Sequence, residues 1–317
     1  MNQKKTLILG ASGFVGAALV QRLVQQGKHV IALGHAEAIE HQGKLVRVRG
    51  TIEDCELLKA LLPECSHVVH AASRTTPGTS AHEPELEILS NLLPLGNLLK
   101  CMAGFPGRIL IYLSSAGAIY GEIAHDATEC SPLRPRSYYG AGKAAAEAFI
   151  HANTMTSDTR AIIIRPTNLY GPGQPIGKGF AIVPTLLQRA LDGQPFQIWG
   201  DGSAVRDFIY LDDLLDALIA VMTQPPDQKF GIYNIASGNL ASILQLVELC
   251  QTTSNRRIHL EFKPARGVDV ARVSPHSERI AEIYGWNAST SLKSGLQRTW
   301  RWFSSHASPG PSATVLL

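Results

Sequence analysis

The feature that most constrains this chain is a glycine-rich stretch close to its N-terminus. An apolar run, Thr6 to Leu9, is followed by Gly10-Ala11-Ser12-Gly13-Phe14-Val15-Gly16 and then by helical spacing, which predicts a buried strand, a loop and a helix. Gly10 permits a tight turn, Gly13 lets the backbone approach a pyrophosphate, and Gly16 lets the helix pack on the strand. Since the helix N-terminus adds N–H donors and partial positive charge, the stretch predicts a dinucleotide-binding loop. A plain strand-to-helix turn is the alternative, because G-x-x-G-x-x-G differs from the simplest dinucleotide fingerprint.

Strand and helix patterns alternate after this loop. Apolar runs predict further strands at 29–33, 45–49, 67–71 and 108–113. Such alternation implies a parallel sheet with right-handed crossovers. We therefore predict an α/β fold, in which a doubly wound parallel (Rossmann) sheet is followed by a smaller C-terminal substrate-binding lobe. The expected parts are a dinucleotide-binding domain over 1–165 with returning segments at about 206–235, a substrate-binding lobe over 166–303, and a disordered tail, rich in serine and proline, over 304–317.

Other elements follow from helical or alternating spacing. A helix is predicted over 85–103, where Pro94 should cause a kink and Asn91 is a polar group that needs a partner on an apolar side. Further helices are predicted at 138–153, 176–193, 211–224, 242–252 and 277–284, and strands at 196–199, 231–235 and 258–262. The last helix, 277–284, is expected in the smaller lobe.

The end of the second strand bears on the choice between NAD and NADP. In NAD-binding folds an acid at this point usually binds the adenosine ribose hydroxyls, but here Leu33 is followed by Gly34-His35-Ala36. Without the acid a 2′-phosphate is not repelled, and His35 is a candidate partner for it. No arginine stands at this point of the sequence to hold that phosphate firmly. We therefore expect NAD as the cofactor, and NADP remains open.

Small and hydroxyl-bearing residues follow the next strands. Ala71-Ala72-Ser73 comes after the strand at 67–71, and Ser114-Ser115 comes after the strand at 108–113. The carboxyl ends of parallel strands form the edge at which open α/β sheets bind ligands. We therefore expect both stretches to approach a cofactor or substrate, with a plain packing turn as the alternative for the first.

Tyr139 and Lys143 form the strongest catalytic candidate. They stand four residues apart in a predicted helix and so share one face. A tyrosine has an unperturbed pKa of about 10, and an ammonium one turn away together with an oxidised nicotinamide would favour its phenolate, giving a usable base. Because such a pair also occurs by chance in many helices, its weight comes from the glycine loop and the serines that precede it.

The ordered motifs resemble those of the extended short-chain dehydrogenase/reductases, and within them the NAD-dependent sugar-nucleotide epimerases typified by UDP-glucose 4-epimerase. The resemblance covers almost all of residues 5–303. It rests on Gly10-x-x-Gly13-x-x-Gly16, Ser-Ser…Ile119-Tyr120-Gly121, Tyr139-x-x-x-Lys143, Arg165-Pro166-Thr167-Asn168-Leu169-Tyr170-Gly171-Pro172, Trp199-Gly200-Asp201-Gly202-Ser203-Ala204-Val205-Arg206-Asp207-Phe208 and Arg266-Gly267-Val268-Asp269.

The resemblance implies three sets of site residues. The catalytic residues would be Tyr139, Lys143 and Ser115. The substrate's nucleotide diphosphate would be held by Asn168, Arg206, Arg266 and Asp269, with the arginines on phosphates, which suits a fork-shaped guanidinium. The cofactor would contact Gly10, Ser12, Gly13, Phe14, Val15, Gly16, His35, Ile52, Ala71, Ala72, Ser73, Asn91, Tyr139, Lys143 and Pro166. Surface ion pairs for the arginines and an Asn turn for Asn168 are the structural alternatives.

One position departs from the family pattern. The hydroxyl that bridges substrate and tyrosine usually stands four residues before the tyrosine of the Tyr-Gly pair, and that place is Ala116 here. Ser115 is one residue early, so it can serve only if the strand end twists or bulges, and a water is the substitute. Ala116, Gly117 and Ala118 also offer no acid or base beside that hydroxyl, which disfavours dehydration of the sugar.

The leading function is NAD(P)-dependent epimerisation at carbon four of a nucleotide-diphosphate sugar through a transient keto intermediate. A 4-keto nucleotide-sugar reductase would use the same residues, and a non-catalytic NAD(P)-binding module is the alternative from another class. The helices at 85–103 and 138–153 could pair in a homodimer, although packing within one subunit explains their apolar faces as well.

Composition bears on the partners, metal sites and location of the protein. The net charge of +3 is spread without a basic run, so we expect no nucleic-acid partner. The five cysteines form no C-x-x-C pair, and we expect reduced thiols and no metal site. The first strand begins after only five residues and no apolar stretch approaches the roughly 20 needed to cross a bilayer, so we expect no signal peptide, no membrane partner and a cytoplasmic location.

Overall fold

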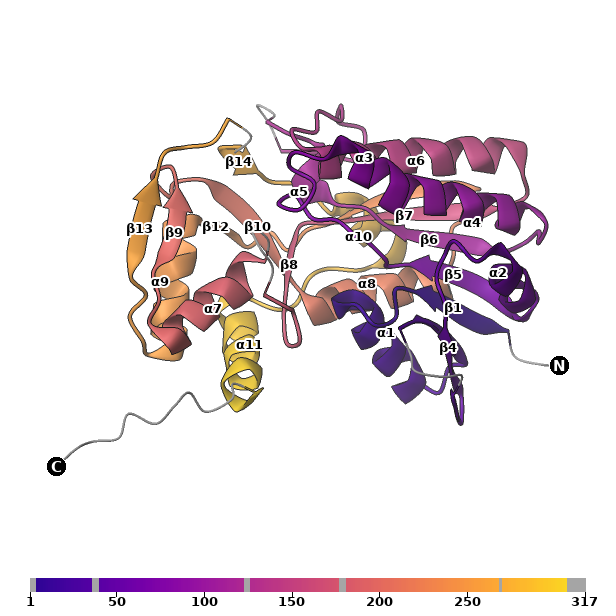
Figure 1. Ribbon diagram of the computed structural model, residues 1–317, viewed down its shortest axis with the longest axis horizontal. Coiled ribbons are helices and arrows are strands. Elements are labelled where there is room, and N and C mark those ends of the chain that lie inside the picture. Colours follow the sequence, from indigo (N-terminus) through magenta and orange to yellow (C-terminus); the bar gives the residue numbers. More distant parts are fainter. Residues whose placement is uncertain (1–3, 36–39, 123–125, 177–180, 268–269, 307–317) are drawn as a thin grey trace.

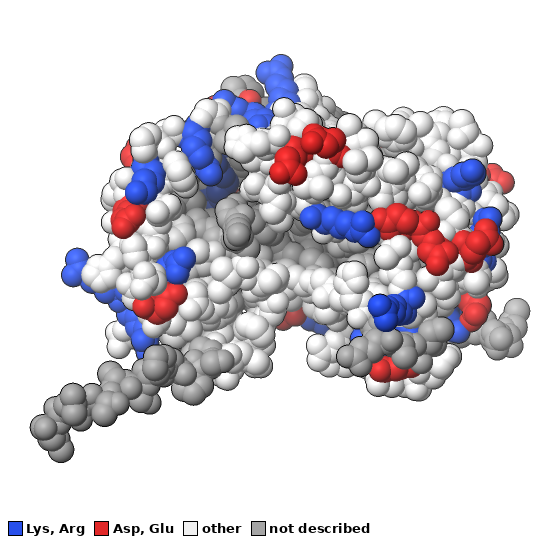
Figure 2. All heavy atoms as spheres, viewed as in Figure 1, with Lys and Arg blue, Asp and Glu red and all other residues white. Residues whose placement is uncertain are grey.

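The computed structural model describes residues 4–35, 40–122, 126–176, 181–267 and 270–306. Within these ranges the chain forms two lobes of unequal size (Figure 1). The larger lobe is built on an eight-stranded sheet and the smaller lobe on a four-stranded sheet and a separate strand pair. Figure 2 shows that the molecular surface is hollowed where the two lobes meet, and that basic and acidic side chains are interspersed on this face.

The large sheet confirms the predicted doubly wound α/β architecture. Its strands lie in the order β11-β7-β6-β5-β1-β2-β4-β3, and every neighbouring pair is parallel except β3 with β4 at the edge. The strands are β1 (Lys5–Leu9), β2 (Val30–Gly34), β3 (Glu40–Gln42), β4 (Leu45–Arg49), β5 (Cys65–His70), β6 (Ile109–Leu113), β7 (Arg160–Pro166) and β11 (Phe230–Ile235).

Helices cover both faces of this sheet because its strands are apolar on both sides. In β1, Ile8 packs in one buried cluster and Leu7 in the other, as the alternation of side chains along a strand requires. The Ile8 face is covered by α1 (Phe14–Gln25), α8 (Leu211–Thr223) and α10 (Glu278–Tyr284). The Leu7 face is covered by α2 (Cys55–Leu61), the short turn η1 (Leu62–Glu64), α4 (Leu93–Ala103) and α6 (Tyr138–Thr156).

The helix predicted over 85–103 is present over 84–103, with a π-helical turn inside it. It consists of α3 (Pro84–Glu87), a π-helical turn η2 (Ile88–Leu92) and α4, with Pro94 near the start of α4. Proline has no N–H to donate and its ring disfavours a regular α-turn before it. A wider π-turn at this point is the way in which the chain accommodates Pro94 without ending the helix.

The smaller lobe is centred on β10 (Val205–Tyr210). This strand pairs with β8 (Asn168–Tyr170), β12 (Leu240–Ser242) and β14 (Arg272–Val273), while β9 (Phe196–Trp199) pairs with β13 (Leu260–Lys263). Three helices, α7 (Ile182–Asp192), α9 (Ile243–Ser254) and α11 (Leu292–His306), contribute Leu187, Leu246 and Leu296 to a third apolar cluster.

Three expected assignments differ from the structure. Helix α10 lies on the large lobe, where Ile280 joins the Ile8 cluster, and not in the smaller lobe. Segments at about 206–235 were expected to return to the large lobe. Helix α8 and strand β11 do lie there, but β10 is the centre of the smaller sheet. Helix α11 continues through Ser304 to His306, so these residues are helical; the rest of the expected tail lies outside the described residues.

Candidate active site

The glycine loop has the close approaches that a dinucleotide cradle requires. Gly10 has a φ of +81°, and a Cβ built on it would lie 2.7 Å from the Cα of Ala72, at the carboxyl end of β5. A Cβ on Gly16 would lie 2.1 Å from the Gly10 carbonyl oxygen. No side chain caps the N-terminus of α1 at Gly13, so the first-turn N–H groups stay available for an anion. These residues fit the pyrophosphate of a dinucleotide, and Phe14 and Val15 anchor the start of α1 in the core.

The adenosine end of this site carries an arginine that sequence reasoning missed. Ser12 Oγ accepts a hydrogen bond from the His35 backbone N–H (3.0 Å), and a Cβ on Gly34 would lie 2.5 Å from the same Oγ. Arg49 is the register partner of Gly34 in the parallel pair β2/β4, so both residues face the side of the sheet on which Ser12 lies. The expectation for this point rested only on the residues that follow Leu33, whereas the pairing of strands brings Arg49, 15 positions further along the sequence, beside Gly34.

Asn91 finds its partner inside the protein. Its Nδ2 donates to Thr75 Oγ1 (2.7 Å) and to Glu87 Oε2 (2.8 Å), and its Oδ1 accepts from the Arg74 N–H (3.2 Å). Ser73 Oγ in turn donates to the Thr75 carbonyl (3.0 Å). Asn91 therefore holds the loop after β5 in place beside the glycine loop. Of the remaining expected cofactor contacts, Ile52 packs on the Leu7 face and Pro166 is the buried last residue of β7.

Tyr139 and Lys143 lie one turn apart near the start of α6. Ser137 caps this helix by accepting a hydrogen bond from the Gly140 N–H (3.1 Å). Lys143 is buried, its Nζ donates to the Leu113 carbonyl at the end of β6 (2.8 Å), and the same Nζ lies 5.7 Å from the centre of the Tyr139 ring. The pair therefore stands at the carboxyl edge of the sheet, where the glycine loop also lies.

Ser115, rather than position 116, reaches the tyrosine. Its side chain is close enough to Tyr139 to lower the pKa of the phenol. Strand β6 ends at Leu113, Ser115 is extended (φ −158°, ψ 104°), and the short helix α5 (Ala116–Ile119) begins directly after it, so the strict alternation of a strand no longer applies. Ala116 is fully buried and packs in a small cluster with Tyr120. The structure thus places a hydroxyl at the tyrosine without one at Ala116.

The residues expected at the nucleotide diphosphate lie in or beside the smaller lobe. Asn168 in β8 donates through Nδ2 to the Asp207 carbonyl (2.9 Å), and its Oδ1 would lie 3.7 Å from a Cβ built on Gly117, so it stands at the junction with α5. Arg206 in β10 donates to the Val205 carbonyl (2.8 Å), and the Arg266 guanidinium lies 5.0 Å from the centre of the Trp199 ring. Asp269 lies outside the described residues.

Comparison with known proteins agrees with this geometry. The model of the NAD-dependent epimerase/dehydratase family matches residues 6–236. The chain belongs to this family. It is 29% identical to a UDP-glucose 4-epimerase of Mycolicibacterium smegmatis, with 94% of this chain and 98% of the relative covered, and 28% identical to a dTDP-4-dehydro-6-deoxy-D-allose reductase of a Streptomyces species (96% and 97%). The family resemblance expected from the motifs is therefore confirmed.

Solved structures of the epimerases in this family superpose closely on the chain. A UDP-glucose 4-epimerase of Thermotoga maritima with UDP-glucose has a TM-score of 0.87 at 26% identity, covering 95% of this chain and 99% of that one. The Thermus thermophilus UDP-glucose 4-epimerase in complex with NAD has a TM-score of 0.87 at 25% identity, covering 96% and 100%. Both matches therefore extend over nearly the whole chain.

The chain's own groups favour the neutral phenol of Tyr139 at this epimerase-family site. Burial of the phenol and the nearby carboxylate of Glu87 raise the pKa of Tyr139 to about 12, and the Ser115 hydroxyl lowers it only in part. Burial lowers the pKa of Lys143 to about 8, against the opposing effects of Glu87 and Glu147. Lys143 alone therefore does not make Tyr139 a base near neutral pH, and the positive charge of an oxidised nicotinamide is needed as well.

A buried ion pair supports the helix that carries these residues. Arg165 Nη2 lies 2.5 Å from Glu147 Oε2, and both side chains are almost fully buried. Arg165 Nη1 also donates to the Tyr120 hydroxyl (2.7 Å), which donates to Asn234 Oδ1 (2.6 Å). The network joins α6 to β7 and β11. None of these residues was assigned to the site from the sequence. The charged Arg165 in a mostly apolar strand nevertheless indicates that a buried partner for its charge must exist.

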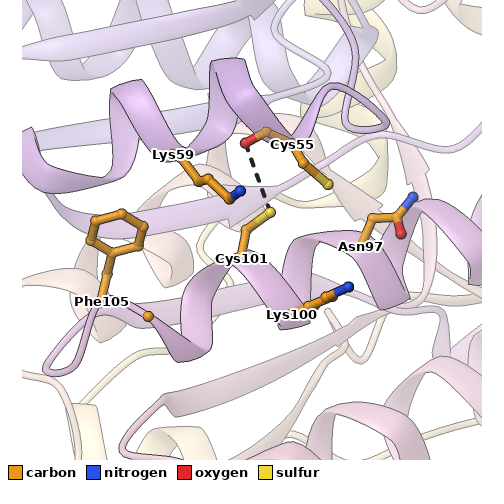
Figure 3. Close-up of a pocket in the computed structure, with 7 residues that line it drawn as sticks. Cys55, Lys59, Asn97, Lys100, Cys101 and Phe105 are labelled. Carbon is orange, nitrogen blue, oxygen red and sulfur yellow. Dashed lines mark hydrogen bonds between the residues drawn. The ribbon is translucent and has the colours of Figure 1, made fainter.

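A pocket outside this site lies between α2 and α4 (Figure 3). It is lined by Cys55, Lys59, Asn97, Lys100, Cys101, Gly104 and Phe105, none of which belongs to the predicted site. Cys101 Sγ donates to the Cys55 carbonyl (3.9 Å), as the dashed line shows, and the described cysteines are free thiols. Among the described residues there is no cluster of His, Cys, Asp or Glu suited to a metal ion, and none of their helices is long and apolar enough to cross a membrane.

Proposed function

We propose that this protein epimerises carbon four of a nucleotide-diphosphate sugar and that Tyr139 is its acid and base. The observation that carries the proposal is the arrangement of three side chains at the same sheet edge as the glycine loop: the Ser115 hydroxyl lowers the pKa of Tyr139, and Lys143 Nζ lies 5.7 Å from the centre of the Tyr139 ring. The bound NAD would supply a hydride acceptor for carbon four and return the hydride to the other face of the keto sugar. Relatives named for this reaction cover nearly the whole chain.

The chain's own residues have distinct tasks in this reaction. Ser115 orients the sugar hydroxyl toward Tyr139, whose phenolate accepts its proton and later returns it. Lys143, held by the Leu113 carbonyl, keeps a cation beside the reacting groups and would bind the nicotinamide ribose. Arg206 and Arg266 would hold the diphosphate from the smaller lobe, and Asn168 would bind the substrate at the junction of the lobes.

A panel of UDP-, GDP- and dTDP-sugars, with and without N-acetyl groups, tests this function. Each is incubated with the purified protein and the products are separated by chromatography. Interconversion of one pair of 4-epimers, without net consumption of cofactor and absent in Tyr139→Phe, is the expected result. No interconversion of any 4-epimer pair would refute it.

A 4-keto nucleotide-sugar reductase is the second candidate, favoured by the 28% identity to a dTDP-4-dehydro-6-deoxy-D-allose reductase. That activity would consume one reduced cofactor for each sugar, whereas the epimerase regenerates its cofactor in every turnover. Cofactor absorbance during the same assays distinguishes the two. Binding of the dinucleotide without any turnover would indicate the non-catalytic module instead.

We also propose a homodimer through the outer faces of α3, η2, α4 and α6. Large apolar side chains are exposed there at Ile88, Leu89, Leu93, Phe149 and Met155, with exposed fractions from 54% to 73%. Helix α6 packs on α3, η2 and α4, so these residues belong to neighbouring helices on one side of the large lobe. Sedimentation should give twice the chain mass, and Phe149→Glu should give the monomer; a wild-type monomer would refute the proposal.

A further inference from the structure

A buried acid that no motif singled out lies against the Tyr139–Lys143 turn. Glu87, the last residue of α3, is 4% exposed. A Cβ built on Gly142 of α6 would lie 2.7 Å from Glu87 Oε2 and 3.5 Å from Glu87 Cβ. Only glycine at 142 lets the carboxylate approach the helix this closely. The π-turn η2 follows Glu87 directly, and both α3 and η2 pack on α6.

The charge of Glu87 is poorly compensated. Oε2 accepts a hydrogen bond from the neutral Asn91 amide (2.8 Å), and Oε1 is buried without a hydrogen-bond partner. The other acid near this turn, Glu147, is bonded to Arg165 at 2.5 Å and so is neutralised locally. Native proteins rarely leave a buried polar atom unsatisfied, and such atoms concentrate where function requires them.

We propose that Glu87 is a positioning residue that sets the protonation states of Tyr139 and Lys143 through its buried, poorly compensated carboxylate. The inference rests on the proposed function, because it concerns the acid and base of that reaction. Glu87 touches neither reacting atoms nor cofactor in this proposal and acts through the two residues of α6.

The physical effect has the same sign at both residues. A negative charge disfavours the phenolate of Tyr139 and favours the ammonium of Lys143, so it raises the pKa of each. Without Glu87, the pKa of Lys143 would fall below about 8, since burial already lowers it, and a smaller fraction of Lys143 would carry its charge in neutral solution. Tyr139 would hold its proton less firmly and would donate it back to the keto sugar less readily.

Other groups face this turn and define the background of the effect. They come from neighbouring elements and are His70 of β5, Tyr112 of β6, Ser115 before α5, and Glu147 of α6 with its partner Arg165 of β7. Burial lowers the pKa of His70 to about 3, so that residue stays neutral in the useful pH range. Burial raises the pKa of Tyr112 well above its usual value, so that phenol stays neutral too.

The test compares pH–rate profiles of the holoenzyme with Glu87→Gln, which keeps the size and an oxygen acceptor for Asn91. If activity requires deprotonated Tyr139 and protonated Lys143, the profile is bell-shaped. Both limbs should move to lower pH in Glu87→Gln, by on the order of one unit, because one charge is removed beside both groups. Glu85→Gln, an exposed acid on the same helix, is the matched control and should leave both limbs in place.

A purely structural role gives a different result. It would lower the rate at every pH in Glu87→Gln without moving the limbs, and this result overturns the proposal. Limbs that move in Glu87→Gln and are displaced equally in Glu87→Asp, which keeps the charge, overturn it as well. Phenolate absorbance provides a readout without substrate: the difference between each protein and its Tyr139→Phe version isolates Tyr139. If the Tyr139 pKa is lower in Glu87→Gln but the wild-type protein turns over no nucleotide sugar, the results support this inference and refute the proposed function. An unchanged Tyr139 pKa would refute the inference alone.

Discussion

Replacement of Ser115 by alanine should slow the reaction strongly, and no substitution at Ala116 should restore the lost rate. The Ser115 hydroxyl lowers the pKa of Tyr139, so its removal takes away a polar partner of a group that becomes charged in the reaction. A hydrogen bond to a charged partner contributes about 1.5–3 kcal/mol, which corresponds to a rate loss of about 10- to 150-fold. The pKa of Tyr139 should rise as well, so the acid limb of the pH–rate profile should move to higher pH.

Ala116→Ser is the matched comparison. The Ala116 side chain is fully buried in the cluster with Ile119 and Tyr120, so a hydroxyl there would be buried among apolar groups instead of facing the substrate. It should lower the free energy of unfolding by about 1–3 kcal/mol without raising turnover. Initial rates over a pH series and thermal denaturation measure both effects. A rate gain in Ala116→Ser with no loss in Ser115→Ala would show that Ser115 does not serve the tyrosine.

Two further predictions concern binding. Arg206→Ala and Arg266→Ala should each raise KM far more than they lower kcat, because phosphates remote from carbon four are held alike in ground and transition states; steady-state kinetics that show a pure kcat loss would contradict the assignment. Arg49→Ala should weaken binding of NADPH about tenfold while leaving that of NADH unchanged, because Arg49 is the strand neighbour of Gly34 and only NADPH carries a 2′-phosphate for a guanidinium to bind. Fluorescence titration measures both affinities, with Arg47→Ala as control on the same strand, and equal losses for the two cofactors would contradict it.

The elements that sequence reasoning recovered are those set by local spacing. The glycine loop, the parallel strands and the Tyr139–Lys143 turn depend on residues within one strand-loop-helix unit or one helical turn, and the structure contains them where they were expected. An irregularity of the helix at Pro94 was expected as a kink, but its form as a π-turn before Pro94 was not, because the spacing of apolar residues does not distinguish the two.

The features that were missed depend on contacts between distant segments. Arg49 meets Gly34 only through strand register, and Glu87 meets α6 only because two helices pack closely at Gly142. The doubt over Ser115 came from applying strand alternation beyond Leu113, where the strand has already ended. Glu87 did carry a signal, since it stands four residues before Asn91 on the same helical face and is bonded to it.

The turnover of Tyr139→Phe on the substrate found by the nucleotide-sugar panel tests the central claim most directly. The change keeps the ring and removes only the proton-transferring hydroxyl, so the protein should retain its fold and its affinity for NAD. Turnover should fall by at least about 10²-fold, because proton transfer to and from the sugar hydroxyl has no other group in place. Near wild-type turnover in Tyr139→Phe would contradict the account, since the geometry around Ser115, Lys143 and Glu87 would then surround a residue that the reaction does not use.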